Sequence, residues 1–259
     1  MPLVTFLSDF GDSDHYVAAV KAAILKESSG TQIIDISHNI KKFDIIHAAH
    51  VLKSVYQDFP QGSIHLVAVN VPSEAGENLI AVKLNEHFFL TSNNGLLSLI
   101  SENDPEALYS IKTTAADSIA TVKDQLAPAI VQLIKGKSLK DIGKPMNLAD
   151  YKRYFPLRVK ATRAIIQGHV VHVDGYGNLI TNIAKTDYDI LSKDKSLQIK
   201  FRNYALTKVL KHYYDCKGGE AFAIFDSNGF LEIGIKEGNA NQLLGLEYGS
   251  MVSIKFDDY

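Results

Sequence analysis

Residues 3–28 read LVTFLSDFGDSDHYVAAVKAAILKES and predict how this chain begins to fold. The first six are apolar or small in a near-continuous run, which is typical of a strand buried on both faces. The last thirteen, residues 16–28, place apolar side chains at helical spacing. A buried strand followed by a helix is the repeating unit of α/β proteins. The stretch therefore predicts an α/β domain at the start of the chain.

Between that strand and that helix lies a polar loop with three aspartates, Asp9, Asp12 and Asp14, around Gly11. The loop follows the carboxyl end of a strand, where open α/β sheets bind ligands. Three interpretations stay open from these residues: a metal site, a polar turn, or a site for a sugar and an amine. An ionised carboxylate accepts hydrogen bonds from hydroxyl and ammonium groups, whereas the spacing lacks a complete calcium-binding loop.

The same pattern continues outward to about residue 145. Short apolar runs alternate with amphipathic segments, which predicts a largely parallel sheet with helices on it. The apolar runs 79–84 and 87–92 are separated only by Asn85 and Glu86, which predicts a hairpin. The remaining predicted strands lie at 32–37 and 63–70, and the remaining helices at 43–59 and 126–136.

The character of the chain changes over residues 146–160, which are polar and show no sustained period, so we expect a linker there. Beyond it, alternating apolar and polar residues predict strands. Asn228 and Gly229 stand between two apolar runs and predict a hairpin. The sequence therefore predicts an α/β domain over 1–145 and a smaller β-rich domain over 161–259.

Composition narrows the function classes. The hydrophobic fraction is 46% and the formal net charge is -2, which is ordinary for a globular protein and argues against general binding to nucleic acid or a membrane surface. Cys216 is the only cysteine, which excludes an intrachain disulfide and a cysteine-based metal cluster. The first residues lack a secretory leader pattern, so we expect a cytoplasmic protein.

Asp35 and His38, in the sequence DISH, end the second predicted strand. Neighbouring parallel strands end at the same sheet edge, so we expect this pair near the Asp9 loop. Two interpretations stay open: the pair belongs to a ligand site, or His38 is a structural histidine that orients a loop.

The segment HVDGYGNLITN, residues 172–182, holds the most informative loop of the second half. Gly175 and Gly177 bracket Tyr176, and Asn178 follows directly. Glycines permit close backbone approach, and an aromatic ring with a nearby amide suits a flat heterocycle, which needs a stacking face and a donor–acceptor pair. A tight β-turn with an exposed tyrosine is the alternative interpretation.

Six segments in chain order carry a resemblance to a known family: SDFGDSDHYV (8–17), DISHNIKKFD (35–44), SNNGLL (92–97), APAIVQLIKG (127–136), DGYGNLITN (174–182) and SNGFLEIGI (227–235). Together they resemble the S-adenosyl-L-methionine (SAM) hydroxide adenosyltransferases, or SAM hydrolases. These are relatives of fluorinating and chlorinating enzymes that attack C5′ of SAM. The resemblance covers nearly the whole chain.

The resemblance implies an α/β N-terminal domain with a Rossmann-like layered sheet and a β-barrel-like C-terminal domain. It also implies a homotrimer in which SAM lies between the N-terminal domain of one subunit and the C-terminal domain of the next. SAM or adenosine would be the partner, as substrate or ligand, with no separate cofactor and no metal.

In the N-terminal domain the resemblance assigns three binding residues. Asp9 is similar to the aspartate that accepts hydrogen bonds from the ribose 2′ and 3′ hydroxyls. Asp14 is similar to a residue near the methionine amino end, and Phe43 to an aromatic that packs against the ribose.

In the C-terminal domain the resemblance assigns Asp174 to the methionine ammonium and Asn178 to the adenine edge. Tyr176 matches the aromatic of a family motif, and Ser227 a serine that holds the methionine carboxylate. Asn228 replaces an arginine found at that turn in the halogenating relatives. The positions where backbone groups meet adenine match Asn239 and Ala240.

The positions implied to be catalytic depart from the family pattern. The hydrolases activate water with an aspartate, an arginine seven residues later and a distant histidine. Here Asn70, Glu77 and Thr121 stand at those positions. Asn70 is neutral and cannot balance a cation, and Glu77 is an acid where the family has a base.

Three functions follow as hypotheses. The chain cleaves SAM at C5′ with weakened water activation, giving adenosine or a 5′-substituted nucleoside and methionine. Alternatively, it binds or senses SAM or adenosine without chemistry. A third possibility is a different small-molecule enzyme with a new site at Glu77, Lys123 and Asp124.

Overall fold

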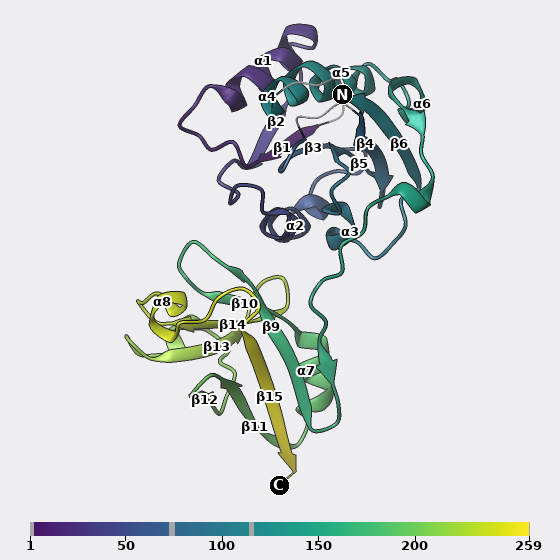
Figure 1. The fold of residues 1–259 in the computed structure, drawn as a ribbon. Helices are drawn as coiled ribbons and strands as arrows, with labels where there is room; N and C mark the ends of the chain where they lie inside the picture. Colours follow the sequence, from purple (N-terminus) through teal and green to yellow (C-terminus); the bar gives the residue numbers. More distant parts are fainter. Residues whose placement is uncertain (1–2, 73–75, 114–116, 259) are drawn as a thin grey trace. The chain divides into compact units, whose positions relative to one another are not determined.

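The computed structural model describes residues 3–72, 76–113 and 117–258, and the chain forms two compact units (Figure 1). The first unit is Met1–Phe155 and the second is Pro156–Tyr259. The boundary between them falls inside the segment 146–160. Within the described residues, no helix is long and apolar enough to cross a membrane.

The first unit is built on a seven-stranded sheet in the order β2-β1-β3-β5-β4-β6-β7. The pairs β1–β2, β1–β3 and β3–β5 are parallel, whereas β4 is antiparallel to β5 and β6, and β7 to β6. The strands are β1 Val4–Ser8, β2 Ile33–Ser37, β3 Ile64–Ala68, β4 Gly76–Leu84, β5 His87–Ser92, β6 Ala107–Thr113 and β7 Lys144–Pro145. The α/β class is confirmed, but the sheet is mixed because the predicted hairpin turns β4 back against its neighbours.

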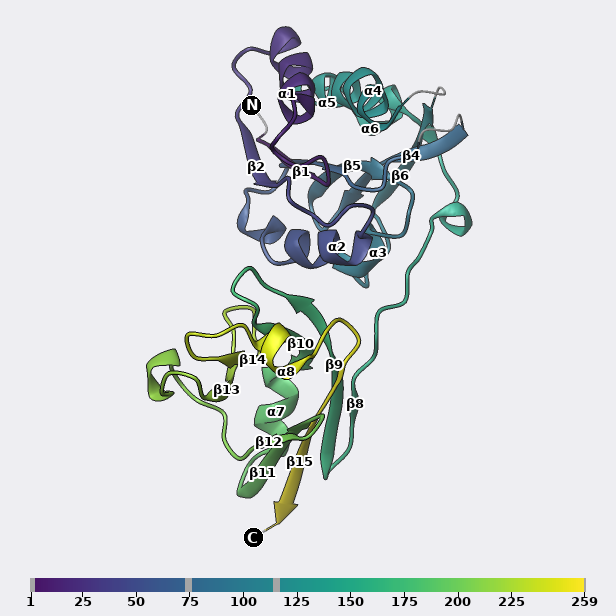
Figure 2. The same cartoon turned by 60° about the vertical axis from the view of Figure 1, so that its left-hand side comes forward.

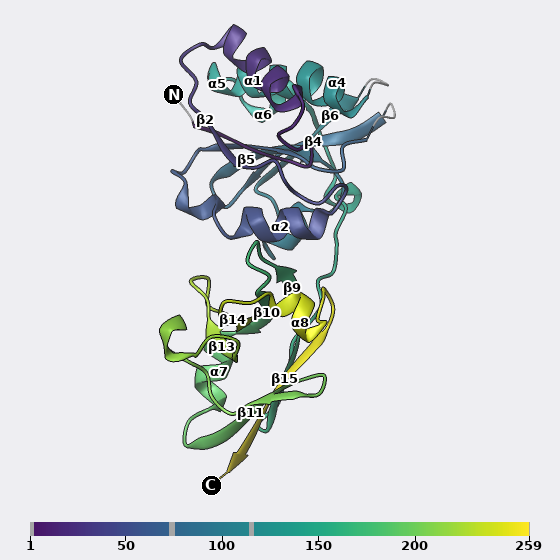
Figure 3. The same cartoon turned by 90° about the vertical axis from the view of Figure 1, so that its left-hand side faces the viewer.

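Helices cover both faces of this sheet (Figure 3). One face carries α1 (Tyr16–Glu27), α4 (Ser118–Thr121), a π-helical turn η2 (Val122–Leu126), α5 (Ala127–Ile134) and α6 (Leu139–Ile142). The other face carries α2 (Ile45–Lys53), the 3-10 turn η1 (Tyr56–Asp58) and α3 (Leu97–Ile100). Each face has its own apolar cluster, and every residue of β1 is buried. This double burial explains the near-continuous apolar run at the start of the chain.

Two local predictions have different outcomes. The hairpin is confirmed, since Asn85 and Glu86 both take left-handed φ values of 50° and 64°, as its tight turn requires. The predicted helix over 43–59 is too long. Asp44 caps it by accepting the Ile46 and His47 N–H groups, and the helix ends at Lys53 because Val55 leaves helical geometry with φ −137°.

Residues after the last helix of the first unit pack back on it. The Asn93 amide donates to the Asp150 carbonyl at 2.9 Å, and its oxygen accepts the Lys152 N–H at 2.9 Å. These bonds follow the 3-10 turn η3 (Leu148–Asp150), and Tyr151 beside it is buried. The SNNGLL segment therefore fastens residues 150–152 to the first unit.

The second unit is an antiparallel, barrel-like sheet in the order β12-β11-β15-β9-β10-β14-β13, with β8 beside β9 (Figure 2). The two end strands, β12 and β13, contact each other. The strands are β8 Lys160–Ala161, β9 Ile165–Val173, β10 Leu179–Ala184, β11 Lys195–Phe201, β12 Tyr204–Leu206, β13 Ala221–Phe225, β14 Phe230–Ile235 and β15 Met251–Asp258. The helices are α7 Lys185–Leu191, α8 Ala240–Leu244 and the turn η4 Tyr213–Asp215. The predicted barrel-like domain and its hairpin at 226–229 are confirmed.

Candidate functional site

The carboxylate of Asp9 joins three loops at the carboxyl edge of the first sheet. Its Oδ2 accepts the backbone N–H of Phe43 at 2.9 Å and that of Asn70 at 3.2 Å. The Asp9 N–H donates to the Ala68 carbonyl at 3.3 Å. We call Asp9, Phe43 and Asn70 the Asp9 cluster. The parallel neighbours β1, β2 and β3 end together, which is why residues so distant in sequence meet here.

Phe43 and Asn70 both adopt left-handed backbone conformations, with φ 65° and 51°. Asparagine tolerates this region, whereas a phenylalanine there is a genuine outlier. Phe43 is also 70% exposed, so its ring is not held by burial in the unit. Strain of this kind is kept where the surroundings over-determine it, as at ligand sites. Here the hydrogen bond to Asp9 is one contact that holds it.

The other two aspartates of the first loop lie outside the cluster. Asp12 is exposed and accepts a hydrogen bond from the Asn39 amide at 3.1 Å. Asp14 is exposed, just before α1. Among the described residues, no group of three or more His, Cys, Asp or Glu side chains is placed to hold a metal ion.

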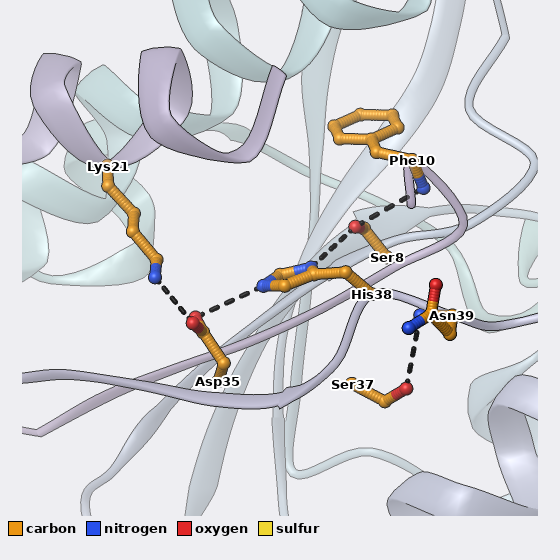
Figure 4. A network of polar contacts seen from close by, with 7 residues as sticks. All are labelled: Ser8, Phe10, Lys21, Asp35, Ser37, His38 and Asn39. Carbon is orange, nitrogen blue, oxygen red and sulfur yellow. Dashed lines mark hydrogen bonds and ion pairs between the residues drawn. The ribbon is translucent and has the colours of Figure 1, made fainter. Parts of the chain in front are cut away.

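A row of polar contacts, which we call the polar row, runs from Ser8, the residue before Asp9, through His38 and Asp35 to Lys21 (Figure 4). Ser8 Oγ is 2.7 Å from His38 Nδ1, and His38 Nε2 is 3.1 Å from Asp35 Oδ1. Lys21 from α1 pairs with the other oxygen of Asp35. Burial alone would raise the pKa of the Asp35 carboxyl, but the hydrogen bonds from Lys21 and His38 outweigh it and hold that pKa below its ordinary value.

The three positions that the resemblance implied to be catalytic lie on three different segments of the first unit. Asn70 lies in the Asp9 cluster through its main chain. Glu77 lies in β4, and its side chain is outside the described part of the chain. Thr121 ends α4, is fully buried, and its hydroxyl has no hydrogen-bond partner among the described residues. Lys123, two positions on, is exposed and lies 3.7 Å from Asp124.

Sequence reasoning missed a residue that supports the cluster. The Asn94 amide donates to the Val69 carbonyl at 3.0 Å, and its oxygen accepts the Leu96 N–H at 3.1 Å. Val69 directly precedes Asn70, so Asn94 fixes the chain that presents the Asn70 N–H to Asp9. The signal was the SNNGLL segment, whose asparagines lie just past the end of a buried strand.

In the second unit, Asp174 organises the loop 174–178, which we call the Asp174 loop. Its Oδ1 accepts the N–H groups of Tyr176 at 2.9 Å and Asn178 at 2.8 Å. The Asn178 side-chain amide donates to Oδ2 at 3.2 Å. Tyr176 is 83% exposed. The loop is therefore a tight turn with an exposed tyrosine, while the interpretation as a site for a flat heterocycle stays a prediction.

The Asp174 loop packs against the start of α8. A side chain added at Gly177, where φ is 84°, would meet the Asn239 amide at 2.3 Å. Asn239 caps α8 by accepting the Gln242 N–H at 2.9 Å, and Asn241 N–H donates to the Gly177 carbonyl at 2.9 Å. The start of α8 therefore packs against Gly177, and the binding roles of Asn239 and Ala240 stay predictions.

The turn between β13 and β14 repeats the local design of the Asp174 loop. Asp226 Oδ1 accepts the N–H groups of Asn228 at 2.9 Å and Phe230 at 2.8 Å. Ser227 and Asn228 are exposed on this turn. Sequence analysis singled out Ser227 and Asn228 and missed Asp226, although aspartate at the first position of such a turn is a known signal.

The charges of this turn and of the Asp174 loop both act on one buried acid, Glu232. Glu232 in β14 is 3% exposed, and its Oε2 accepts the Tyr213 hydroxyl at 3.0 Å. Its Oε1 has no partner among the described residues. Burial raises the pKa of Glu232, and the charges of Asp174 and Asp226 add to the rise. Burial and the Glu232 charge raise the pKa of Tyr213 to about 12. Burial and the two neighbouring carboxylates therefore disfavour the charged form of Glu232.

Comparison with known proteins gives the family context. The SAM hydroxide adenosyltransferase N-terminal domain matches residues 4–143, and the C-terminal domain of the same family matches 168–253. An (R)-S-adenosyl-L-methionine hydrolase of Methanocaldococcus jannaschii is 26% identical over 98% of this chain and 96% of its own.

More distant likenesses agree with that context. A fluorinase of Actinoplanes is 22% identical over 73% of this chain and 74% of its own. A crystal structure of an uncharacterised conserved protein from Thermotoga maritima superposes with a TM-score of 0.85 at 26% identity, covering 98% and 100% of the two chains.

Proposed function

Because the chain belongs to the SAM hydroxide adenosyltransferase family, we propose that it binds SAM and cleaves it slowly at C5′ to adenosine and methionine. One observation carries the proposal more than any other. The Asp9 carboxylate is held by two backbone N–H groups on the same oxygen, Oδ2. A carboxylate has about four acceptor positions, so it retains capacity for the two hydroxyls of a ribose.

The remaining contacts suit the other parts of SAM. Phe43 presents an exposed ring beside Asp9, which suits packing against a sugar. In the second unit, Asp174 presents a carboxylate to an ammonium, and Asn178 and Asn239 supply amides for a heterocycle edge. The binding roles that the resemblance implies are also proposed for Asp14, Tyr176, Ser227, Asn228 and Ala240.

Cleavage needs little from the protein at the leaving group. A water oxygen bonds to C5′ as the C5′–S bond breaks, the bonding pair moves to sulfur, and the water gives up a proton. The sulfonium becomes the neutral thioether of methionine. General-base help contributes about 10²–10⁴-fold, while positioning contributes more. Asn70 has no basic side chain and Thr121 is fully buried, which supports slow turnover.

The test follows products by mass spectrometry after the purified full-length chain is incubated with SAM in ¹⁸O-labelled water. We expect slow formation of equal amounts of methionine and adenosine, with the label in the 5′ hydroxyl. Asn70→Asp restores a carboxylate at this position, and we expect it to raise the rate by at least about tenfold. We do not combine it with Thr121→His, because Thr121 is fully buried and a larger side chain there would disturb the packing. Turnover no faster than in a buffer blank overturns the proposal.

A non-catalytic SAM or adenosine binder is the second candidate function. The observation that favours it is the buried, unpaired hydroxyl of Thr121, which has no route to a ligand in the described structure. Calorimetric titration with SAM and adenosine separates the candidates: heat without labelled product identifies a binder. If the chain binds neither SAM nor adenosine, both candidate functions are overturned.

We also propose the homotrimer that the resemblance implies, with SAM bound between subunits, and the cytoplasmic setting expected from the sequence. Sedimentation equilibrium of the full-length chain measures the assembly. A monomer that nevertheless turns over SAM would contradict the intersubunit site.

A further inference from the structure

The polar row consists of Ser8, His38, Asp35 and Lys21. Ser8 Oγ lies 2.7 Å from His38 Nδ1, so a hydrogen bond joins the two side chains. Ser8 Oγ also accepts the Phe10 N–H at 3.4 Å. On the other side of the ring, His38 Nε2 lies 3.1 Å from Asp35 Oδ1, and Lys21 pairs with Asp35 Oδ2.

This arrangement resembles a nucleophile with its base, but burial excludes that role. Ser8 has no exposed surface, and Phe6 packs edge-on against His38 with ring centroids 4.7 Å apart. A substrate carbon cannot reach a hydroxyl that is enclosed on all sides. The polar row can therefore affect a ligand only indirectly, by fixing the position of the residues that are bonded to it.

Those residues are the two neighbours of Asp9. Ser8 precedes Asp9 and is fixed by its bond to His38. Phe10 follows Asp9 and donates its N–H to Ser8. The next residue, Gly11, donates its N–H to the His38 carbonyl at 2.8 Å. His38 thus holds the loop from both its side chain and its main chain, with Asp9 between the two attachments.

We propose that Ser8 and His38 are positioning residues for Asp9, and that they thereby set how strongly the chain selects a ribose with a free 2′ hydroxyl. The inference rests on the proposed nucleoside site. A carboxylate discriminates by hydrogen bonding only where its oxygens stand at the right place. Loss of the row leaves Asp9 bonded to the Phe43 and Asn70 N–H groups but releases the residues on either side of it, Ser8 and Phe10.

The same strand offers a matched control on its other face. Thr5 Oγ1 is 2.7 Å from Nδ1 of a second buried histidine, His65, the same distance as in the Ser8 pair. His65 Nε2 lies 3.1 Å from His87 Nδ1, so within the part of the chain that the structure describes this pair leads away from the Asp9 loop. Alternate residues of a strand point to opposite faces. Thr5→Val therefore removes one buried hydroxyl from β1 without touching the row.

The experiment compares Ser8→Ala with Thr5→Val in the full-length chain, with Asp9→Asn as the reference for loss of the carboxylate. Affinities for adenosine and 2′-deoxyadenosine are measured by calorimetry, and thermal unfolding is recorded for each variant. We expect the wild type to prefer adenosine by about tenfold or more, as a hydrogen bond to a charged group allows. Asp9→Asn should bring the preference close to one.

Ser8→Ala should reduce the preference to about a third or less of the wild-type value, while Thr5→Val keeps it within about twofold at a similar loss of thermal stability. His38→Asn, whose amide oxygen can still accept from Ser8, should retain more of the preference than His38→Ala. Equal preferences in Ser8→Ala and wild type overturn the inference. If wild type binds neither nucleoside, the proposed function itself fails, which is a distinguishable result.

Discussion

Asp9 and Asp174 both hold a loop by accepting backbone N–H groups with their carboxylates, but their partners lie at very different distances along the sequence. Asp9 accepts N–H groups from residues 34 and 61 positions away in the sequence. Among the described residues, the Asp174 carboxylate accepts from residues two and four positions away. Asp174 therefore belongs to a loop that closes on itself, whereas Asp9 has its partners only when three strands are already in place.

The difference separates two ways to preorganise a carboxylate. Closing a short loop costs little chain entropy, so the Asp174 loop is specified by five neighbouring residues. Bringing Phe43 and Asn70 to Asp9 depends on the whole sheet, and both residues accept a left-handed backbone to reach it. Substitutions in the Asp9 cluster should therefore disturb contacts between distant segments of the first unit. Substitutions in the Asp174 loop should disturb mainly that loop and the residues packed on it.

The largest effect is expected for Asp9→Ala. It removes the acceptor for two backbone N–H groups and for the proposed ribose hydroxyls, and a hydrogen bond to a charged group is worth about 1.5–3 kcal/mol. We expect adenosine affinity to fall at least about 100-fold, or about 2.7 kcal/mol. Calorimetry measures the change, and circular dichroism checks the fold. An affinity within threefold of wild type would show that Asp9 does not contact the ligand.

Gly177→Ala should be the next largest. The residue has φ 84°, and the added methyl would stand 2.3 Å from the Asn239 side chain. The left-handed backbone alone costs about 1–2 kcal/mol, and displacing Asn239 adds to it. Chemical denaturation should show a lower free energy of unfolding. Gly175→Ala is the matched control because nothing lies within 4 Å of its added methyl, and equal losses in both variants would contradict the explanation.

Asp174→Asn tests whether the local loop needs its charge. Asparagine forms the same side-chain turn, so we expect the free energy of unfolding to change by less than about 1 kcal/mol. The proposed ammonium contact is weakened, so SAM affinity should fall about tenfold while adenosine affinity stays unchanged. Both are read from titrations. A parallel loss for both ligands would place Asp174 at the nucleoside instead.

A smaller effect, visible in its pH dependence, is expected at Glu232. Its pKa is raised by burial and by Asp174 and Asp226, so the folded chain binds this proton more tightly than the unfolded chain does. Stability from this group is full below the unfolded pKa of a glutamate and declines as pH rises through the raised folded value. Glu232→Gln should remove that decline, as measured by denaturation between pH 4 and pH 8. An unchanged slope would mean that Glu232 titrates normally.

The smallest effect is expected for Asp12→Asn. Asp12 is exposed and makes one hydrogen bond, to the Asn39 amide. Surface substitutions of this kind stay within about 0.5 kcal/mol. We expect unchanged thermal unfolding and unchanged adenosine affinity. A clear loss of binding would extend the site beyond the Asp9 cluster.

Much of the second unit's site could be predicted because its signals are local. Gly177 and Asn178 stand beside Asp174 in the sequence, and the turn at Asn228 and Gly229 forms as predicted. Asp226 also had a local signal, which was missed. Glu232 gave none, because an acid in a β-strand pattern reads as a solvent-facing residue until Tyr213 covers it.

The first unit was harder to predict in detail. Strands β1 to β5 and the hairpin were predicted from apolar runs, whereas β6 and β7 were not predicted. The sheet is mixed because β4 pairs antiparallel with both β5 and β6. Asn70 was considered for its side chain, whereas the structure uses its N–H. Such a contact cannot be predicted from the residue type, because every residue except proline has a backbone N–H. The one hint is that asparagine tolerates left-handed φ values.

The sequence by itself determined the two fold classes through apolar patterning, and a tight turn at the Asp174 loop through neighbouring residues. It also carried the family resemblance, which rests on six segments spread along the chain. Only the tertiary structure decided that Asp9 meets Phe43 and Asn70, that His38 contacts Ser8, and that Thr121 is buried. The physical reason is separation along the chain. Contacts between residues tens of positions apart form only when strands pair and pack, and side-chain types alone do not encode their geometry.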